Sequence, residues 1–401
     1  MRILMWEHFA PGGPIRVGGH HLADRFLRDG AEIAWCVGPI SPINFIKTNR
    51  ETRARLRLWW RGGERAAAGK PFAYAPMTIA PYRPYPLFSS RAMHRLTLRA
   101  TIPRLTRVLS RAGFDRVDLL WMTPGSPLLA LLDAIPHGRS VYRMSDDTPA
   151  FPDTPKSYAG IEEETVRRVD LVVATARCLA DRAQRLGARR VLHLPNACDP
   201  TRFSSGPFKE PADLSRWPRP RAIYAGAIDS WFDVALLAEM AALRPDWSFV
   251  LLGPVRTDLR RLEGLANVVL LGPRDYCDLP AYLGAADAGL VPFRKEPLTE
   301  AIHPIKVYEY CAAGLPVVSV PLRETAATGA PILFAGNAAA FAEALDRALG
   351  ENDAARRERI AFARSNSWDA RYGRLKEMLA TIATPAESAG RPVPLPMRRP
   401  A

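Results

Sequence analysis

Short runs of β-branched and other apolar residues alternate with amphipathic stretches of helix length along most of the chain. This alternation is typical of βα units built around a parallel sheet. In the first half it predicts strands at residues 2–6, 32–37, 117–122, 140–143, 171–174 and 191–194, and helices at 20–28, 93–111, 161–168 and 176–186. After residue 220 it predicts strands at 222–225, 248–252, 268–271, 288–291 and 316–320, and helices at 233–242, 279–285, 304–313 and 338–349.

The segment between the two halves, residues 204–220, contains four prolines and shows little periodicity, as an interdomain linker would. A chain of 401 residues, 48% of them hydrophobic, has enough material for two cores. We therefore expect one α/β domain over 1–203 and a second over 221–367. A final helix is expected over 368–382, followed by a proline-rich tail over 383–401 that we expect to be disordered.

The positive charge of the chain is concentrated in one region. The formal net charge is +14, and residues 47–111 hold fifteen Arg or Lys against only Glu51 and Glu64. Within this region the apolar residues Leu56, Leu58, Trp59 and Trp60 lie among Arg53, Arg55, Arg57 and Arg61. Tryptophan beside arginine suits a lipid headgroup layer, so the pattern favours an anionic membrane surface as a partner of residues 47–111.

Two other interpretations of the basic region stay open. One is a solvated, arginine-rich helix surface, and the other is binding to nucleic acid. No helix-turn-helix, zinc-finger or RNP-like motif accompanies the arginines, so we expect no nucleic-acid partner. Because the five cysteines are scattered singly and the apolar run at residues 3–6 is too short for a signal peptide or a membrane span, we expect a cytoplasmic protein.

The segment TEAIHPIKVYEYCAAGLPVVSV, residues 299–320, is the most informative motif. It predicts a helix that begins at Pro304 and stops at Gly314, before a buried strand. His303, Lys306 and Glu309 recur every three residues and would share one face. The amino end of a helix binds diphosphate well; Lys306 would add a counter-charge, and Glu309 could accept hydrogen bonds from ribose. The alternative is a surface ion pair between Lys306 and Glu309.

HPIKVYEYCAAGLPVVSV resembles the donor-site segment of GT-B glycosyltransferases, including family-4-like enzymes and the xanthan glucuronosyltransferase group. IYAGAIDSWFD at 223–233, SFVLLGP, NVVLLGP and ADAGLVPF follow the same order as in those enzymes. The resemblance implies two Rossmann-like α/β/α domains that face a central cleft, with the acceptor in the N-terminal and the donor in the C-terminal domain. It places Gly226, Ala227 and Ile228 beside the nucleotide and Phe293 beside the base or sugar, although plain packing is an equal alternative for Phe293.

One position departs from the family pattern. Retaining family-4 enzymes usually carry a second glutamate seven residues before the one that matches Glu309, and here that residue is Ile302. Glu300 lies two residues further back and would need a different loop. A retaining mechanism is therefore in doubt.

Asp146 is the candidate catalytic residue. VYRMSDDTPAFPD, residues 141–153, places Asp146 and Asp147 at the carboxyl end of a strand, where open α/β sheets bind their ligands. VYRMSDD resembles the segment that holds the aspartate base in xanthan-type glucuronosyltransferases, and the match falls on Asp146. Inverting transfer needs such a carboxylate to take the acceptor's proton. The alternative role for both acids is to cap the following turn.

Weaker signals come from two other loops. Gly18 and Gly19 follow the first strand and would let backbone approach a substrate in the cleft, whereas His20 and His21 read as ordinary surface residues. HLPNACD, residues 193–199, resembles the segment that closes the first domain in this superfamily. Asn196 and Asp199 are therefore possible cleft residues, with a role in the hinge as the equal alternative.

The protein is expected to be a hexosyl- or glucuronosyltransferase that uses a nucleotide-sugar, with UDP favoured. No DxD triplet occurs, so we expect no metal and no cofactor beyond this co-substrate. The expected acceptor is lipid-linked or a glycan, in bacterial-type polysaccharide or glycoconjugate assembly, with the enzyme peripheral on the inner membrane face. A nucleotide-sugar 2-epimerase on the same architecture and a basic nucleic-acid-binding protein are the alternatives.

Overall fold

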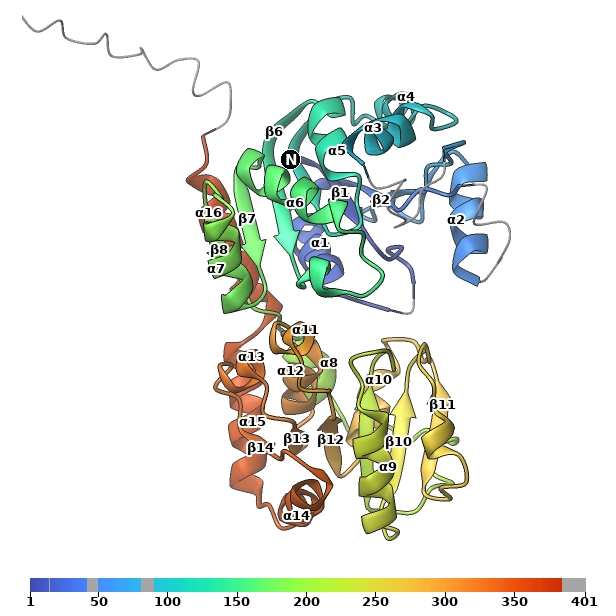
Figure 1. Ribbon diagram of the computed structural model, residues 1–401, viewed down its shortest axis with the longest axis vertical. Coiled ribbons are helices and arrows are strands. Elements are labelled where there is room, and N and C mark those ends of the chain that lie inside the picture. The colour runs from blue at the N-terminus through green and yellow to red at the C-terminus, as the bar shows by residue number, and fades with distance from the viewer. Residues whose placement is uncertain (14, 42–49, 81–89, 384–401) are drawn as a thin grey trace, which may run out of the picture.

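The computed structural model describes residues 1–13, 15–41, 50–80 and 90–383, and shows two α/β lobes stacked along the long axis of the molecule (Figure 1). Each lobe is built on one mostly parallel sheet with helices on both faces. The expected tail beyond residue 383, and residues 47–49 and 81–89 of the basic region, lie outside the described residues. The expectation of two Rossmann-like α/β domains in a GT-B arrangement is confirmed.

The first sheet has eight strands in the order β3-β4-β2-β1-β5-β6-β7-β8. Its strands are β1 (Arg2–Glu7), β2 (Glu32–Val37), β3 (Glu64–Arg65), β4 (Phe72–Tyr74), β5 (Val117–Met122), β6 (His137–Met144), β7 (Leu171–Ala174) and β8 (Val191–His193). All neighbours are parallel except the edge pair β3 and β4. The helices are α1 (Gly18–Arg28), α2 (Arg50–Trp60), α3 (Arg91–Arg99), α4 (Leu105–Arg111), α5 (Leu128–Ala134), α6 (Ser157–Arg168) and α7 (Arg177–Arg185).

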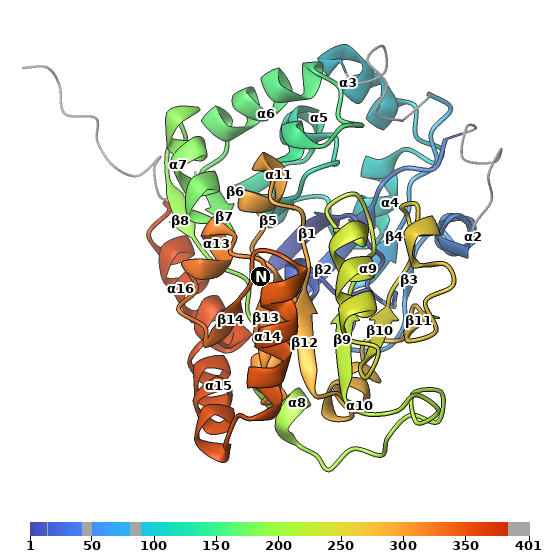
Figure 2. The same ribbon diagram turned by 60° about the horizontal axis from the view of Figure 1, so that its bottom comes forward.

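The second sheet has six parallel strands in the order β11-β10-β9-β12-β13-β14. These are β9 (Arg221–Ala225), β10 (Ser248–Leu252), β11 (Val268–Gly272), β12 (Ala288–Val291), β13 (Val317–Ser319) and β14 (Ile332–Phe334). The helices are α8 (Pro200–Ser204), α9 (Val234–Leu243), α10 (Leu279–Gly284), α11 (Pro297–Glu300), α12 (Ile305–Ala312), α13 (Arg323–Ala326), α14 (Ala338–Leu349), α15 (Asp353–Ser365) and α16 (Trp368–Ala380). Figure 2 shows α9 and α14 in front of this sheet.

Both faces of the first sheet are buried, because alternate residues of each strand point to opposite sides. In β1, Leu4 and Trp6 belong to the core under α3 to α7, while Ile3 and Met5 belong to the core under α1 and α16. The second sheet has a separate core, formed where helices including α8, α12 and α14 pack against its strands. Burial on both faces explains why strands such as β1 and β7 read as nearly continuous apolar runs.

Most predicted strands and helices lie within one to four residues of the observed bounds. Helices α2, α5 and α15 were not predicted, and two further kinds of element differ from the prediction. The single helix expected over 93–111 is two helices, because Pro103 lacks the N–H that a continuous helix needs. Strands β3, β4 and β14 have only two or three residues each, too few to show an alternation. Their pairing comes from neighbouring strands and not from a local pattern.

The C-terminal helix α16 returns to the N-terminal lobe, where it lies beside α1 (Figure 1). Trp368, Leu375 and Leu379 are buried in the core on that face of the first sheet. Residues 205–220 form no helix or strand and are held to the second lobe by buried Leu214 and by the ion pair between Asp213 and Arg274. The two lobes are therefore joined at two places along the chain.

Candidate active site

Helix α12 begins at the junction of the two lobes. Pro304 occupies the position before its first residue in an extended conformation, with φ −75° and ψ 119°, so the helix starts one residue later than predicted. Gly314 ends it with φ +73°, a left-handed conformation that favours glycine. The leading backbone N–H groups of any helix have no acceptor within the helix, and those of α12 lie at the junction, where the helix begins (Figure 1).

The Lys306 side chain lies between two aromatic rings. Its ammonium group is 4.8 Å from the ring centre of Tyr224 on β9 and 4.7 Å from that of Phe293, which follows β12. No carboxylate among the described residues lies within ion-pair distance of it. Burial lowers the pKa of Lys306 to about 8, and the nearby charge of Glu309 opposes this shift. The group is thus a partly desolvated cation without a carboxylate contact, and the surface ion pair considered above is absent.

The turn after β9 brings backbone close to this ammonium group. Gly226 has φ +148°, and a Cβ placed on it would lie 3.2 Å from the Lys306 Nζ. The next residue is held by a side chain, since Tyr224 donates its hydroxyl to the Ala227 carbonyl at 2.7 Å. Ile228 is fully buried, and its N–H donates to Pro254. Gly226 and Ala227 are therefore positioned beside Lys306, whereas the Ile228 side chain belongs to the core.

Glu309 lies one turn further along α12 and is only 6% exposed. Burial raises the pKa of its carboxyl to about 7, and Tyr276 and Lys306 pull it back down. The ring of Tyr276 is itself flanked by Arg16 at 6.0 Å and Arg202 at 5.2 Å. A buried acid and three basic or hydroxyl-bearing neighbours thus line the junction beside the amino end of α12.

His303 does not share the face of Lys306 and Glu309, contrary to the predicted spacing. It precedes the helix, and the extended Pro304 interrupts the three-residue rhythm between positions 303 and 306. The imidazole stacks on Tyr308, with ring centres 5.4 Å apart, and its Nε2 is 3.2 Å from the Tyr308 hydroxyl. This places His303 on the opposite side of α12 from the Lys306 ammonium group.

Glu300, considered above as a substitute for the missing glutamate, is engaged elsewhere. Its carboxylate accepts a hydrogen bond of 2.6 Å from the backbone N–H of Arg323, at the start of α13. Ile302 packs against the core of the second lobe. Neither residue supplies a carboxylate beside Lys306.

Asp146 lies just beyond the carboxyl end of β6. Ser145 donates its hydroxyl to the Asp146 carboxylate at 2.9 Å. Burial raises the pKa of Asp146, and Ser145 and the charge of Arg143 act against this shift. Its neighbour Asp147 makes no capping hydrogen bond with its side chain and lies 3.6 Å from Arg182 instead. Capping by a side chain therefore does not account for Asp147.

Gly18 and Gly19 open α1 against two buried charged side chains. A Cβ on Gly18 would lie 2.2 Å from an Arg143 nitrogen, and one on Gly19 would lie 2.2 Å from a Glu7 oxygen. Glu7 accepts a hydrogen bond of 2.9 Å from the Trp121 indole, and burial raises its pKa to about 7. The close approach that these glycines permit is thus to Arg143 and Glu7 of the protein itself.

His20 and His21 are buried, so the expectation that they are surface residues is wrong. His20 is 2% exposed and its Nε2 lies 3.1 Å from the Ala10 carbonyl, while His21 stacks on Trp368 with ring centres 5.1 Å apart. Helix α1 is covered by α16, and this long-range packing has no signature near residue 20. His21 also lies 3.1 Å from Asp199, which pairs with Arg25. Asp199 thereby links α8 to α1.

Asn196 connects the two lobes. Its Oδ1 accepts a hydrogen bond of 2.9 Å from Arg143, and its Nδ2 donates one of 2.7 Å to the His303 carbonyl. The sequence reasoning missed Arg143, whose one local signal is an arginine at the end of the predicted strand 140–143. Such a residue must find partners when the strand is buried. Arg143 thus lies among Glu7, Asp146 and Asn196, at the edge of the sheet that faces α12.

Other contacts between the lobes surround this connection. Glu324 of α13 accepts hydrogen bonds from the backbone N–H groups of Arg177 and Cys178, at 2.9 and 3.0 Å. Phe151 after β6 meets Trp231 after β9 edge to face, with ring centres 6.4 Å apart. Within the described ranges, no three His, Cys, Asp or Glu side chains gather as metal ligands, and no helix has the length and apolarity needed to cross a bilayer.

Comparison with known proteins agrees with this arrangement. Residues 219–351 match the family model described as glycosyl transferases group 1. Over 284 residues the chain is 27% identical to TuaH of Bacillus subtilis strain 168, which is provisionally named a teichuronic acid biosynthesis glycosyltransferase. That alignment covers 64% of this chain and 70% of TuaH.

Solved structures resemble the chain over nearly its whole length. Sucrose-phosphate synthase from Thermosynechococcus elongatus superposes with a TM-score of 0.69 at 16% identity, covering 94% of this chain and 98% of its own. HepE from Anabaena, in complex with UDP and glucose, gives 0.65 at 16% identity, covering 95% and 100%. The trehalose-6-phosphate synthase OtsA gives 0.66 at 14% identity, covering 96% and 100%. Residues 219–351 thus belong to the group 1 glycosyl transferases, and the chain is a glycosyltransferase with the GT-B fold.

Proposed function

We propose that the protein transfers a sugar from a UDP-sugar to a lipid-linked or glycan acceptor, with the donor held by the C-terminal lobe. The diphosphate would lie against the first turn of α12, beside the Lys306 ammonium group and the Gly226 turn. Glu309 would accept hydrogen bonds from the ribose hydroxyls. Phe293 would contact the donor only through the edge of its ring, because it is 2% exposed.

The observation that carries this proposal is the environment of Lys306. A partly buried ammonium group without a carboxylate contact is costly, and an anionic ligand would offset that cost. The leading N–H groups of α12 and the positive end of its dipole favour an anion at the same place. HepE, which is similar in fold, has been solved with UDP and with UDP-glucose, which supports a uridine donor here.

The donor is tested by thermal stability of the full chain against a panel of UDP-, GDP- and ADP-sugars. A ligand that binds only the folded state raises the melting temperature, and we expect this rise with a UDP-sugar. Lys306→Ala should abolish the rise and Glu309→Ala should reduce it. Lys295→Ala, which removes an exposed lysine of the same lobe, is the matched control. A rise that persists in Lys306→Ala would refute the proposed donor site.

We assign the role of base to Asp146. In this mechanism its carboxylate takes the proton of the acceptor hydroxyl while that oxygen attacks the anomeric carbon. The bond from the anomeric carbon to the donor phosphate oxygen breaks, and Lys306 stabilises the charge on the departing diphosphate. Burial raises the pKa of Asp146, which makes the carboxylate a better proton acceptor. Inversion of the anomeric configuration, measured by NMR of the product, is the expected outcome.

The proposal of a lipid-linked acceptor is based on the basic region, residues 47–111, which would contact a membrane. In the part of this region that the structure describes, four large apolar side chains are exposed: Trp60, which is 81% exposed, and Ile79, Leu96 and Ile102. Leu58 is buried and Trp59 donates its indole N–H to the Ile102 carbonyl at 2.5 Å, so these two apolar residues of α2 are engaged with the protein itself. Trp60 with exposed Arg53 and Arg57 would attach the enzyme to an anionic membrane beside its acceptor.

The 2-epimerase alternative makes a different prediction for nucleotide release. An epimerase would act on the nucleotide-sugar without a second substrate, whereas a transferase releases nucleotide at a high rate only when an acceptor is present. The match of residues 219–351 to the glycosyl transferases group 1 model favours transfer over both the epimerase and a nucleic-acid-binding protein.

A further inference from the structure

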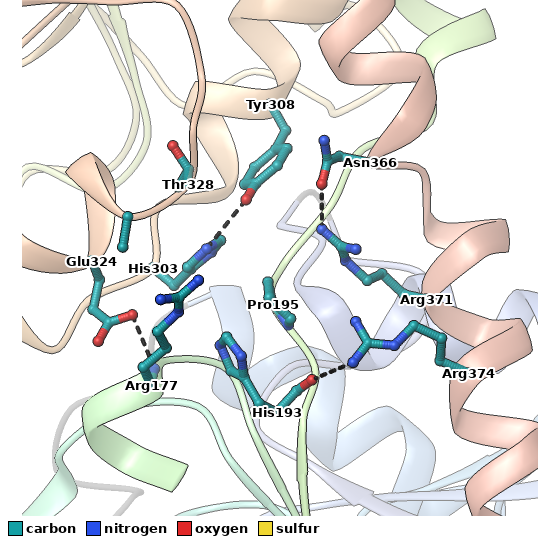
Figure 3. A pocket seen from close by; sticks show the side chains of 11 residues that line it. Arg177, His193, Pro195, His303, Tyr308, Glu324, Thr328, Asn366, Arg371 and Arg374 are labelled. Carbon is teal, nitrogen blue, oxygen red and sulfur yellow. Dashed lines mark hydrogen bonds between the residues drawn. The ribbon is translucent and has the colours of Figure 1, made fainter. Parts of the chain in front are cut away.

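A pocket with a volume of about 210 Å³, separate from the proposed donor site, lies where the two lobes and α16 meet. Its charged and imidazole-bearing lining residues are Arg177 of α7, His193 of β8, His303 before α12, Glu324 of α13, and Arg371 and Arg374 of α16. Figure 3 shows these side chains arranged around one space, to which both lobes contribute. Lys306 and Glu309 do not line it.

The pocket carries uncompensated positive charge. Three of its lining residues are arginines, and Glu324 is its one carboxylate. That carboxylate already accepts the backbone N–H groups of Arg177 and Cys178 at the start of α7, at 2.9 and 3.0 Å. Since Glu324 serves as the cap of α7, it does not pair with the guanidinium groups.

Several polar atoms of the pocket lining have no hydrogen-bond partner among the described residues. They are the Nδ1 of His303, the Nε2 of His193 and the Nε of Arg371. His303 is 5% exposed and Arg371 8% exposed. Buried polar groups nearly always have a partner, so three unpartnered nitrogens in one pocket indicate a missing hydrogen-bonding group.

The surrounding charges repel one another. Burial, together with the charges of His193 and Arg371, lowers the pKa of His303 to about 3. Burial also lowers the pKa of Arg371, which is unusual for a guanidinium. An anion would relieve both effects, because it supplies acceptors to the unpartnered donors and opposite charge to the arginines.

The pocket differs from the proposed donor site by its position on α12. Tyr308, which stacks on His303, is two residues from Lys306, and two residues are about 200° apart around a helix. The volume is below the roughly 300–1,000 Å³ of pockets for larger ligands, and it suits a small anion with part of its hydration water.

We propose that this pocket binds a phosphate group, through Arg177, Arg371 and Arg374 with the two imidazoles as further hydrogen-bonding groups. Because the lining comes from both lobes and from α16, the bound phosphate joins them in the arrangement seen here. Occupation of this pocket therefore stabilises the folded two-lobed chain and the approach of α12 to the first sheet.

Titration calorimetry with inorganic phosphate, at constant ionic strength, tests the proposal on the full chain. The double variant Arg177→Gln/Arg374→Gln should weaken binding about tenfold or more, since charged hydrogen bonds are worth about 1.5–3 kcal/mol. Both side chains lie at the exposed rim, so the variant should fold. Arg357→Gln/Arg364→Gln removes the same charge from exposed positions of α15 and should leave the affinity unchanged.

Binding at the donor site is separated from binding in this pocket by two measurements. Lys306→Ala should retain phosphate binding, and UDP should not compete with phosphate. Loss of binding in Lys306→Ala, or competition by UDP, would overturn the second site while leaving the donor site intact. Equal affinity in the wild type and in the Arg177→Gln/Arg374→Gln variant would also overturn it.

The phosphate could be free or part of a lipid headgroup, and vesicles distinguish the two. Phosphatidylcholine vesicles with and without phosphatidic acid present the same phosphate chemistry on a membrane. Binding of either free phosphate or phosphatidic acid that depends on Arg177 and Arg374 supports the site and identifies its source. If neither probe shows this dependence, the proposal is wrong.

Discussion

Asn196 donates a 2.7 Å hydrogen bond from its side chain to the backbone carbonyl of His303, two residues before α12 begins. The same amide accepts a hydrogen bond from Arg143 of the first sheet at 2.9 Å. One side chain therefore couples the strand that precedes Asp146 to the loop that precedes Lys306. The relative position of the proposed base and the proposed donor site depends on this amide.

Removal of this amide tests the coupling between the lobes. Asn196→Ala removes the hydrogen-bond acceptor of buried Arg143, which should cost about 1–3 kcal/mol of stability. We expect kcat to fall more than the affinity for nucleotide, because the two lobes shift relative to each other. Asn352→Ala, which removes the cap of α15 at a cost of about 1 kcal/mol, controls for lost stability alone. Equal falls in kcat for both variants would contradict the coupling.

The low pKa of Lys306 predicts a pH dependence of donor binding. Burial lowers this pKa to about 8, so the free enzyme loses the ammonium charge as the pH rises through about 8. Affinity for UDP, measured by calorimetry, should fall by about tenfold for each pH unit above that value. Lys306→Ala should bind UDP weakly, with an affinity that changes little with pH. The affinity of Lys295→Ala for UDP should show the same pH dependence as that of the wild type.

The lowered pKa of Lys306 also affects the stability of the fold. Whereas donor affinity should fall as the pH rises, the contribution of Lys306 to stability should increase. Between pH 8 and 10.5 the unfolded chain holds the Lys306 proton and the folded chain does not. The contribution of this group to the free energy of unfolding therefore increases with pH across that window. Denaturant titration of the wild type and Lys306→Ala at pH 8 and pH 10 measures this difference, and parallel changes in both proteins would contradict the shift.

Asp146→Asn should spare donor binding and remove turnover. The amide has nearly the shape of the carboxylate but cannot accept the acceptor's proton, and general-base catalysis typically contributes about 10²–10⁴-fold. The melting-temperature rise with the UDP-sugar should persist while the rate of sugar transfer falls by that factor. Asp153→Asn, at an exposed position nearby, should transfer at the normal rate. Normal turnover in Asp146→Asn would remove Asp146 from the mechanism.

Gly253 supports the turn beside Lys306 from the neighbouring strand. A Cβ at this position would lie 1.9 Å from the Gly226 carbonyl oxygen, and its φ of +146° already disfavours other residues. Gly253→Ala should displace the Gly226 turn and weaken nucleotide binding. Gly329→Ala has a φ of +70° with open space around it, so it should only destabilise, by roughly 1 kcal/mol. Unchanged nucleotide affinity in Gly253→Ala would show that the turn does not contact the donor.

The basic region predicts a membrane contact centred on α2. Arg53→Gln/Arg57→Gln should reduce sedimentation with anionic vesicles, by an amount consistent with about 1 kcal/mol for each arginine near the surface. Trp60→Ala should reduce it further. Arg55 is left unchanged, because it pairs with Glu51 at 2.5 Å and donates to the His8 carbonyl. Sedimentation that is unchanged in all of these variants would exclude α2 as the contact.

The local sequence pattern was sufficient to predict the bounds of a strand or helix wherever the residues that define the element lie close together in the sequence. The strands at 32–37, 117–122 and 171–174 match the prediction residue for residue, because burial on both faces makes all their residues apolar except exposed Glu32 and Asp118. Helix α12 was also predicted to within one residue, since proline before it and glycine after it are strong local signals.

Predictions failed where long-range contacts decide the environment. His20 and His21 looked like surface residues because nothing near them in the sequence shows that α16, more than 340 residues later, covers α1. The close approach of Arg143 and Glu7 to Gly18 and Gly19 is likewise set by residues far away in the sequence, and the role of these glycines in the cleft stays a prediction. His303 does not lie on the helix face of Lys306 and Glu309, because the extended Pro304 separates it from the helix.

The sequence alone determined that the chain forms two parallel α/β domains and that Lys306 and Glu309 lie on one short helix, because hydrophobic periodicity and helix-end residues act over a few positions. Only the tertiary structure decided which groups meet at the junction of the lobes. Lys306 lies between Tyr224 and Phe293, and Asn196 lies between Arg143 and His303, through contacts that span from 13 to more than 100 residues. Desolvation at that junction, which depends on the packing of the whole chain, sets the charge properties of the site.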